Sequence, residues 1–232
     1  MTRKLPLVSV IIPLHNGERF IRAAADSVLR QVYSNLELLV VDDGSTNDSL
    51  REVPSDARVR ILKTKRIGNA AARNLGIAHS RGEFIAFLDQ DDFWDVGKLE
   101  VQVQHLIEAP SCDAAICLVK YVIDPGTSRP GWLHDGIYEK ETPAYLVGAL
   151  LARRTLFDRL GGFDTTFDYG SDSDWFFRAT DSGAVIRTIN ATLLYKRVHD
   201  RNQSHRIDES RHDLFRAAKL AADRKRNATR PK

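Results

Sequence analysis

The sequence predicts an α/β protein with a mostly parallel central sheet covered by helices. Four short apolar runs recur with helix-like segments between the main ones, a pattern typical of parallel strands that are buried on both faces. Most of these runs end in polar, turn-forming residues, as strands do at the ligand-binding edge of an open α/β sheet. The runs are LVSVII at 7–12, LELLVV at 36–41, VRIL at 59–62 and FIAFL at 84–88.

The segments that connect these runs have the composition of crossover helices. Residues 69–79 are rich in alanine, and residues 98–108 have the spacing of an amphipathic helix. Residues 18–31 also predict a helix, because helical spacing gathers their apolar side chains on one face. That face contains Phe20, Ile21, Ala24, Ala25, Val28 and Leu29.

The second half of the chain is less regular. It predicts a long strand at 114–123, a loop rich in proline and glycine from 124, a core strand at 144–152, a short helix ending at Gly161–Gly162 and a strand at 185–189. From Asp208 onward the sequence predicts a basic helix. This helix is either a solvated terminal segment or a peripheral contact with anionic lipid.

The composition excludes several classes of protein. With 34 basic and 31 acidic residues among 232, the net charge of +3 is too small to indicate nucleic-acid binding over the whole surface. Cys112 and Cys117 have no histidine or further cysteine at metal spacing, which favours reduced core thiols in a cytoplasmic protein over a zinc site. Pro13 interrupts the apolar N-terminal run, so no signal peptide is expected. No apolar run approaches the roughly 18 to 20 residues that cross a bilayer, so any membrane contact is expected to be peripheral.

Three carboxylates follow the fourth apolar run. Asp89, Asp91 and Asp92 need a cation or solvent nearby, because an unpaired buried charge is costly. In an extended stretch Asp89 and Asp91 point the same way and can share one hard divalent ion. Mg²⁺ or Mn²⁺ bound in this way completes its shell with water and substrate phosphate oxygens. The stretch lacks the glycine and the late glutamate of a calcium-binding EF-hand.

Two further acidic stretches have both a structural and a functional interpretation. DDGSTND at 42–48 is either a turn with Ser45 or Thr46 capping the next helix, or a source of hydrogen-bond acceptors for a base or ribose. In GSDSDWFFRA at 170–179, a helix beginning near Ser171 places Asp172 and Asp174 at its N-terminus, where the helix dipole favours negative charge. A carboxylate there can also serve as a general base.

Taken in order, the motifs resemble the family 2 glycosyltransferases of GT-A fold. The resemblance covers about residues 7 to 204 and implies a Rossmann-like GT-A domain over 1–207. Within it we expect a nucleotide-binding half at 1–95 and an acceptor half at 96–207 that contains a smaller mixed region, followed by a basic helix or tail at 208–232. The motifs are VSVIIPLHNGERFI, LELLVVDDGSTNDS, GNAAARNLGIAHSRGEFIAFLDQDD, GGFD, GSDSDWFFRA and YKRVHDRNQS.

The resemblance also implies roles for individual residues. Asp91 is expected to contact the metal directly, Asp89 to contact the ribose or the metal through water, and His199 to join the metal. Asp172 matches the catalytic base. The family commonly has tyrosine where this chain has His15, and glutamate where it has Ser171. The donor nucleotide is expected to contact Pro13, His15, Asn16, Asp42, Asp43, Arg73 and Asp89.

The expected function is therefore an inverting transfer of a sugar, with Mn²⁺ or Mg²⁺, from a UDP-sugar to a carbohydrate or glycolipid acceptor. A cytoplasmic enzyme at the inner membrane face would suit such an acceptor. Two alternatives remain open. A nucleotidyltransferase would normally carry a glycine-rich basic loop after its first strand, where this chain has PLHNGERF. An inactive relative that only binds a nucleotide sugar is conceivable because of His15 and Ser171. A Rossmann dehydrogenase is excluded by the missing G-x-G-x-x-G.

Overall fold

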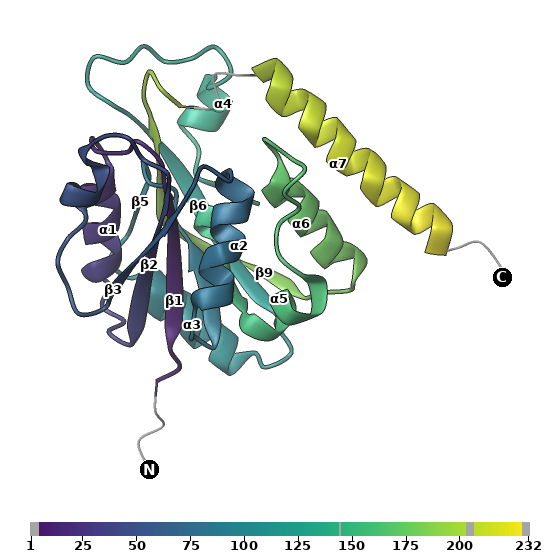
Figure 1. The fold of residues 1–232 in the computed structure, drawn as a ribbon. Coiled ribbons are helices and arrows are strands. Elements are labelled where there is room, and N and C mark those ends of the chain that lie inside the picture. The colour runs from purple at the N-terminus through teal and green to yellow at the C-terminus, as the bar shows by residue number, and fades with distance from the viewer. Residues whose placement is uncertain (1–4, 144, 203–206, 229–232) are drawn as a thin grey trace.

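The chain folds into a single curled sheet with helices on both faces (Figure 1). The computed structural model describes residues 5–143, 145–202 and 207–228. The strand order is β3-β2-β1-β4-β8-β6-β9-β5, and β7 pairs with β6. The first four of these strands are parallel, which confirms the predicted α/β class. The strands are β1 Val8–Leu14, β2 Leu36–Asp43, β3 Val59–Thr64, β4 Phe84–Phe87, β5 Phe93–Trp94, β6 Ala114–Ile123, β7 Thr142–Pro143, β8 Leu151–Arg153 and β9 Ile186–Val198.

Strands β1 and β2 form the core of the first half of the chain. Every residue of β1 and β2 is buried, as expected for parallel strands covered on both faces. Glu37 in β2 is buried among apolar neighbours, and its carboxylate accepts hydrogen bonds from Ser9 Oγ at 2.6 Å and from Arg60 Nη1 at 3.0 Å. A buried charge with such partners does not break the strand pattern.

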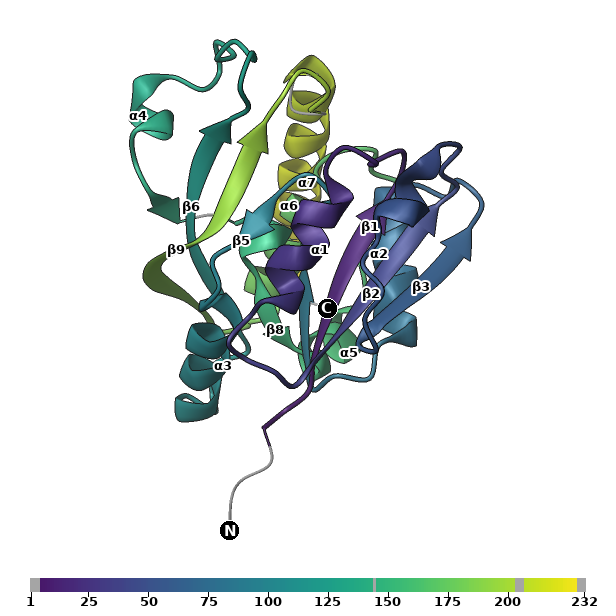
Figure 2. The same ribbon diagram turned by 90° about the vertical axis from the view of Figure 1, so that its left-hand side faces the viewer.

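The crossover helices of the first half lie on opposite faces of the sheet. Figure 2 shows α1 (Ile21–Leu29) in front of the sheet and α2 (Asn69–His79) behind the strands β1 to β3. Helix α3 (Lys98–Glu108) packs against β6 and β8. The bounds of α2 and α3 equal the predicted ranges. At Gly76 in α2 a Cβ would lie 2.4 Å from Ile11 Cγ2, so only glycine lets this helix approach β1 so closely.

The predicted core strand at 144–152 is wrong. Residue 144 lies outside the described residues, Val147–Ala149 form the 3-10 helix η2, and only the three residues of β8 pair in the sheet. Side chains occupy the backbone acceptors of this segment: Trp94 Nε1 donates to the Gly148 carbonyl at 2.9 Å, and Gln102 Nε2 donates to the Ala149 carbonyl at 2.9 Å. The segment therefore satisfies its polar groups without a strand partner.

A lysine is fully buried at the start of α3. Lys98 Nζ donates to Gln102 Oε1 at 2.6 Å and lies 4.1 Å from the centre of the Trp94 ring. Gln102 Nε2 in turn donates to carbonyls of β6 and η2. Burial lowers the pKa of Lys98 to about 8. This cluster connects α3 to β6 and η2.

The last helices pack together on one side of the molecule (Figure 1). Helix α5 (Arg154–Leu160) ends at Gly161, as predicted, with the positive φ of 78° that favours glycine. Helix α6 (Ser171–Asp181) buries Trp175, Phe176 and Ala179, also as predicted. The basic helix α7 (Ile207–Ala228) runs along α6, and residues 229–232 of the predicted tail lie outside the described chain. Two short helical segments, η1 (Asp48–Glu52) and α4 (Asp135–Tyr138), complete the structure.

Candidate active site

The turns after β1 and β2 are joined by hydrogen bonds at the carboxyl edge of the sheet. His15 Nδ1 bonds the Asp43 carbonyl at 2.9 Å, so this nitrogen must carry the proton. Asn16 has a positive φ of 50°. Its backbone N–H donates to Ser45 Oγ at 3.0 Å, and its side-chain Oδ1 accepts from the backbone N–H of Thr46 at 2.9 Å. Pro13 is buried at the end of β1. The structure thus brings the expected nucleotide-binding residues of both turns together.

The two aspartates of the DDGSTND stretch already hold backbone groups. Asp43 accepts from the N–H of Ile67 at 2.6 Å and of Gly68 at 3.0 Å, one bond to each carboxylate oxygen. Asp42 Oδ1 accepts from the Ser45 N–H at 3.0 Å. The expected helix cap is neither Ser45 nor Thr46: Asn47 caps η1 by accepting from a backbone N–H two residues later. The stretch is a rigid turn whose acceptors retain further lone pairs.

The acidic stretch after β4 is a turn, and the expected extended geometry is wrong. The Asp92 N–H donates to the Asp89 carbonyl at 3.1 Å, which closes the turn. Because of it, the carboxylates of Asp89 and Asp91 reach different partners. Asp89 accepts from Arg73 Nη2 at 2.6 Å, whereas Asp91 accepts from the segment after β9.

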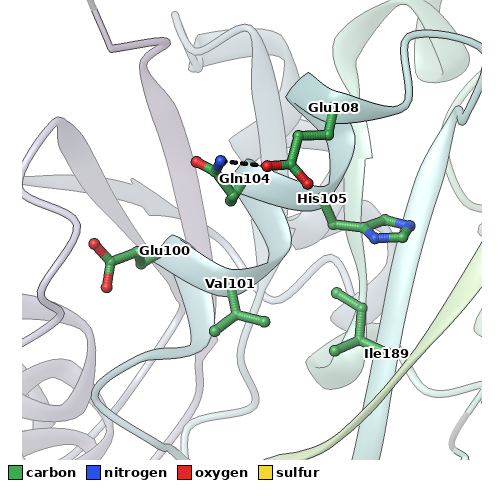
Figure 3. Close-up of a pocket in the computed structure, with 6 residues that line it drawn as sticks. All are labelled: Glu100, Val101, Gln104, His105, Glu108 and Ile189. Carbon is green, nitrogen blue, oxygen red and sulfur yellow. Dashed lines mark hydrogen bonds between the residues drawn. The ribbon is translucent and has the colours of Figure 1, made fainter.

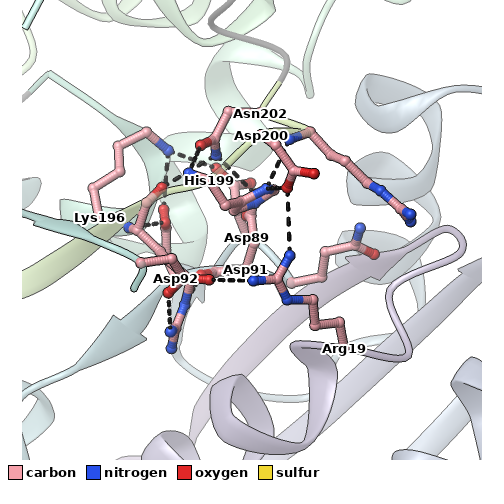
Figure 4. Close-up of polar contacts among 12 residues, drawn as sticks. Arg19, Asp89, Asp91, Asp92, Lys196, His199, Asp200 and Asn202 are labelled. Carbon is pink, nitrogen blue, oxygen red and sulfur yellow. Dashed lines mark hydrogen bonds and ion pairs between the residues drawn. The ribbon is translucent and has the colours of Figure 1, made fainter. Parts of the chain in front are cut away.

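Asp91 meets the segment that follows β9 (Figure 4). His199 Nε2 lies 3.0 Å from Asp91 Oδ2, and Asn202 Nδ2 donates to the same oxygen at 3.2 Å. The Asn202 Oδ1 accepts from the His199 N–H, which fixes the backbone, and the His199 ring stacks on Phe20 with 4.3 Å between centroids. Within the described residues no group of three or more His, Cys, Asp or Glu side chains gathers as a metal site. Asp91 and His199 are nevertheless a carboxylate and imidazole pair of the kind that divalent metals accept.

Lys196 is the central cation of the acidic cluster. Its Nζ lies 3.0 Å from Asp92 Oδ2 and 3.7 Å from Asp89 Oδ2 (Figure 4). Burial raises the pKa of Asp92 to about 7, and the charges of Asp91 and Asp89 push it in the same direction. Burial acts to lower the pKa of Lys196, but the three carboxylates outweigh it and raise that pKa above its usual value. When Asp92 is ionised, three carboxylates face two cations here, Lys196 and Arg73, so the cluster then carries an excess of negative charge.

Asp172 lies in the first turn of α6, within electrostatic reach of the same cluster. Burial raises the pKa of its carboxyl, the charge of Arg73 opposes this rise, and the charge of Asp89 adds to it. Its Oδ1 accepts from the Ser173 N–H at 2.9 Å. Asp174, on the same turn, is held by Arg178 at 2.8 Å and by Arg224 at 3.4 Å, so its carboxylate is engaged in ion pairs.

Arg73 connects Asp89 with the surroundings of Asp172. The residue is 5% exposed, its guanidinium lies 5.6 Å from the Phe163 ring, and its buried Nε has no hydrogen-bond partner among the described residues. A buried guanidinium N–H without a partner is costly, and a ligand oxygen would satisfy it.

An ion-pair network holds the His199 segment against the turn that precedes α1. Asp124 accepts from Arg197 Nη1 at 2.7 Å and from Arg19 Nη2 at 3.0 Å, and Arg19 also reaches Asp200 at 3.3 Å (Figure 4). Sequence reasoning missed Lys196, Arg197, Asn202 and Asp124. The signal that could have found the first three is their position beside His199 in YKRVHDRNQS.

The chain matches known proteins over most of its length. The sequence model described as Glycosyl transferase family 2 matches residues 9–171, more than half of the chain. The chain belongs to glycosyl transferase family 2. A family relative of Escherichia coli, the UDP-Glc:alpha-D-GlcNAc-diphosphoundecaprenol beta-1,3-glucosyltransferase WfgD, is 44% identical over 105 residues, which are 44% of this chain and 42% of that protein. An uncharacterized glycosyltransferase of Rickettsia typhi is 30% identical over 84% of this chain and 65% of its own length.

Solved structures confirm the GT-A fold of this family 2 chain. A mannosyltransferase from Pyrobaculum calidifontis, in complex with GDP-Man and Mn²⁺, matches with a TM-score of 0.74 and 24% identity over 94% of this chain and 64% of that one. TarS of S. aureus in complex with UDP-GlcNAc matches with a TM-score of 0.71 and 20% identity over 93% of this chain and 65% of that one. The chain thus spans about two thirds of these proteins or less.

Two other features of the structure lie apart from this site. A hollow of about 440 Å³ lies on the outer side of α3, at the opposite end of β9 from His199, and side chains of that one helix form most of its wall (Figure 3). Its residues are Glu100, Val101, Gln104, His105, Glu108 and Ile189. It contains no residue of the acidic cluster. Among the helices of the described chain, none combines the length and the apolar character needed to span a bilayer.

Proposed function

We propose that the chain transfers a sugar from a nucleoside diphosphate sugar to an acceptor hydroxyl, with inversion at the anomeric carbon. The observation that carries the proposal is the 3.0 Å contact of Asp91 with His199 beside the Asp89–Arg73 ion pair, in electrostatic reach of Asp172. Together these residues offer a metal-binding pair, a cation for phosphate and a general base. Glycosyl transfer needs these three elements at one place.

The proposed donor is a UDP-sugar. The turns that carry His15 and Asp43 are similar to the turns that bind the nucleotide base in this family, for which uracil is usual. The E. coli relative is named for its use of UDP-Glc, and TarS has been solved with UDP-GlcNAc. The mannosyltransferase was solved with GDP-Man, so the donor assay must include guanine nucleotides.

The proposed cofactor is Mn²⁺ or Mg²⁺, held by Asp91 and His199 with Asp89 beside them. Oxygen and nitrogen ligands of this kind, next to a carboxylate excess, suit such ions. A bound cation would supply positive charge to the leaving diphosphate. Arg73 contributes a second positive charge close to the same groups, and its unpaired Nε is a donor for a phosphate oxygen.

Asp172 is the proposed general base. Its carboxylate takes the proton of the acceptor hydroxyl while the hydroxyl oxygen bonds to the anomeric carbon, and the bond from that carbon to the diphosphate breaks on the opposite face. Burial raises the pKa of Asp172 toward the operating pH, which makes it a stronger base. The Ser173 N–H holds one of its oxygens and leaves the other for the substrate.

The test of the base is Asp172→Asn, with Asp168→Asn as the matched control on an exposed carboxylate. Turnover should fall by about 10² to 10⁴-fold in the first variant, since general-base catalysis is typically worth that much. The affinity for the donor, measured by calorimetry with Mn²⁺, should stay unchanged. Near-normal turnover of Asp172→Asn would remove it from the mechanism.

The test of the reaction class is hydrolysis of a panel of UDP- and GDP-sugars with Mn²⁺. Slow, metal-dependent release of one sugar identifies the donor and argues against an inactive relative. A larger thermal shift with a nucleoside triphosphate than with UDP would favour a nucleotidyltransferase instead. For the acceptor we propose a carbohydrate or glycolipid, because the name of the E. coli relative specifies a lipid-linked sugar.

A further inference from the structure

Helix α7 is fixed to the rest of the molecule along one side only. Its inner side buries Ala217 and Ala221 against α6, and Arg224 pairs with Asp174 at 3.4 Å and with Asp181 at 3.1 Å. Arg216 donates to the Thr166 carbonyl at 2.9 Å. These bonds fix the rotation of α7 about its axis and therefore determine which side chains point outward.

Large apolar side chains are exposed on the outward side of α7. Phe215 is 74% exposed and Leu214 is 48% exposed, and both are large apolar side chains. At about 100° per residue, these two and the exposed Ala218 and Ala222 fall within an arc of about 100° on the helix surface. In Figure 1 α7 is the outermost element on its side of the molecule. We call this arc the outward face of α7.

Among residues 211–226, the charges on and beside the outward face are basic. Arg211 and Lys225 fall within the arc, near its two ends along the helix, and Lys219 and Arg226 lie beside it; all four are exposed. Lys225 pairs with Asp181 at 3.5 Å and Arg226 pairs with Asp223. The acidic residues of this range, Asp213 and Asp223, lie outside the arc. Apolar side chains on one face with flanking Lys and Arg are the features of helices that lie in a lipid–water interface.

We propose that the outward face of α7 docks onto an anionic lipid bilayer, with Phe215 and Leu214 inserted among the lipids. A second copy of the chain fits less well, because a symmetric contact would place like charges opposite each other. Nucleic acid would be bound by the basic residues but would leave the apolar residues in water. Of these three partners, only an anionic bilayer contacts both the apolar and the basic side chains of this face favourably.

The proposed docking places the lipid surface across α7 from the N-terminal turn of α6, at a separation of about one helix diameter, roughly 10 to 12 Å. Asp213 Oδ2 accepts from the Tyr169 N–H at 2.9 Å, and a Cβ on Gly170 would lie 3.5 Å from Asp213 Cβ. Asp172 follows two residues later. For an acceptor anchored in the bilayer, the hydroxyl would therefore be presented from the side of the general base; this last step rests on the proposed function.

The experiment measures binding of the full chain to vesicles of phosphatidylcholine alone or with phosphatidylglycerol, without nucleotide sugar. The variant Leu214→Ser/Phe215→Ser should bind anionic vesicles at least about tenfold more weakly, since burying one such side chain is worth that much or more. The matched control is Val32→Ser/Val96→Ser, two exposed apolar residues away from α7, and should bind as the wild type does.

A second pair of variants tests the charge. Arg211→Ser/Lys219→Ser should lose about fivefold in binding for each basic residue removed, whereas the exposed lysines of Lys120→Ser/Lys140→Ser should have no effect. Unchanged binding of the α7 variants, or equal binding to neutral and anionic vesicles, would overturn the proposal. So would a wild-type dimer in solution that Leu214→Ser/Phe215→Ser converts to a monomer.

Activity assays separate this proposal from the proposed function. Leu214→Ser/Phe215→Ser should retain nucleotide-sugar hydrolysis and transfer to a water-soluble acceptor, and should lose transfer to a vesicle-bound acceptor. Vesicle binding without any transfer would support the docking and contradict the enzyme assignment. Transfer to a water-soluble acceptor without vesicle binding would support the enzyme assignment and contradict the docking.

Discussion

The buried lysine of α3 makes a quantitative prediction about stability. Lys98 is 0% exposed and has a pKa of about 8 in the folded chain, against 10.5 as its ordinary value. Between these two pH values the unfolded chain binds one more proton than the folded chain. The free energy of unfolding therefore rises with pH over this window. At about 1.4 kcal/mol per pKa unit, the total contribution of Lys98 is about 3 kcal/mol.

In the variant Lys98→Met, the free energy of unfolding should lack the part of this rise with pH that comes from Lys98. At pH 7 the two proteins should differ little, because the variant avoids the buried charge but leaves Gln102 Oε1 without its donor, at a cost of about 1 to 3 kcal/mol. At pH 10 the wild type should be the more stable. The measurement is urea unfolding from pH 7 to 10.5, with the exposed Lys120→Met as control. Comparing the two curves cancels titrating groups that do not interact with Lys98. Cys117 does interact, because burial raises its pKa and the charge of Lys98 lowers it, so both curves are measured in chains that also carry Cys117→Ala. Parallel curves for wild type and Lys98→Met would refute the reasoning.

Two further predictions concern the acidic cluster. Lys196→Met should destabilise the fold by about 3 to 5 kcal/mol, because it leaves buried carboxylates without their cation, and Asp92→Asn in the same chain should recover most of the loss. Equal unfolding midpoints for the single and the double variant would contradict this pairing. Asn202→Ala should weaken Mn²⁺ binding about 10 to 100-fold with little change in melting temperature, because Asn202 orients both Asp91 and His199. Metal titration followed by calorimetry tests it, and an unchanged affinity would show that this amide does not position the pair.

Local sequence patterns predicted the regular elements well. Helices α2 and α3 and strand β6 begin and end at the predicted residues, since each has a clear apolar period and a polar or glycine boundary. The segment at 144–152 was misjudged for the opposite reason. Its apolar run is buried as expected, but Trp94 and Gln102, distant in sequence, bind its carbonyls. No local pattern reveals donors that come from elsewhere in the chain.

The motifs predicted which residues lie at the site but not which side chains pair with each other. The residues expected from the resemblance lie at the carboxyl edge of the sheet, but their pairing did not follow from spacing. Asp89 and Asp91 were expected to point the same way, and a turn separates them. Lys196 lies 104 positions from its partner Asp92 and becomes a neighbour only because β5 pairs with β9. A lysine in a strand gives no sign in the sequence that it will lie half-buried among carboxylates.

The irregular pairing of β6 with β9 determines where β9 tolerates the deletion or insertion of a residue. Cys117 pairs with Ile189, Leu118 with Thr192 and Val119 with Leu194, so β9 accommodates extra residues at two successive bulges. Strand side chains alternate between the two faces of a sheet. Asn190, Ala191 and Leu193 have no partner in β6, so a deletion among them should be absorbed by the bulges while the later pairs stay in register. A deletion after Leu194, where the pairing is regular, would turn over every later side chain of β9, including that of Lys196. Chain length is therefore constrained in the regular part of the strand and tolerant at the bulges.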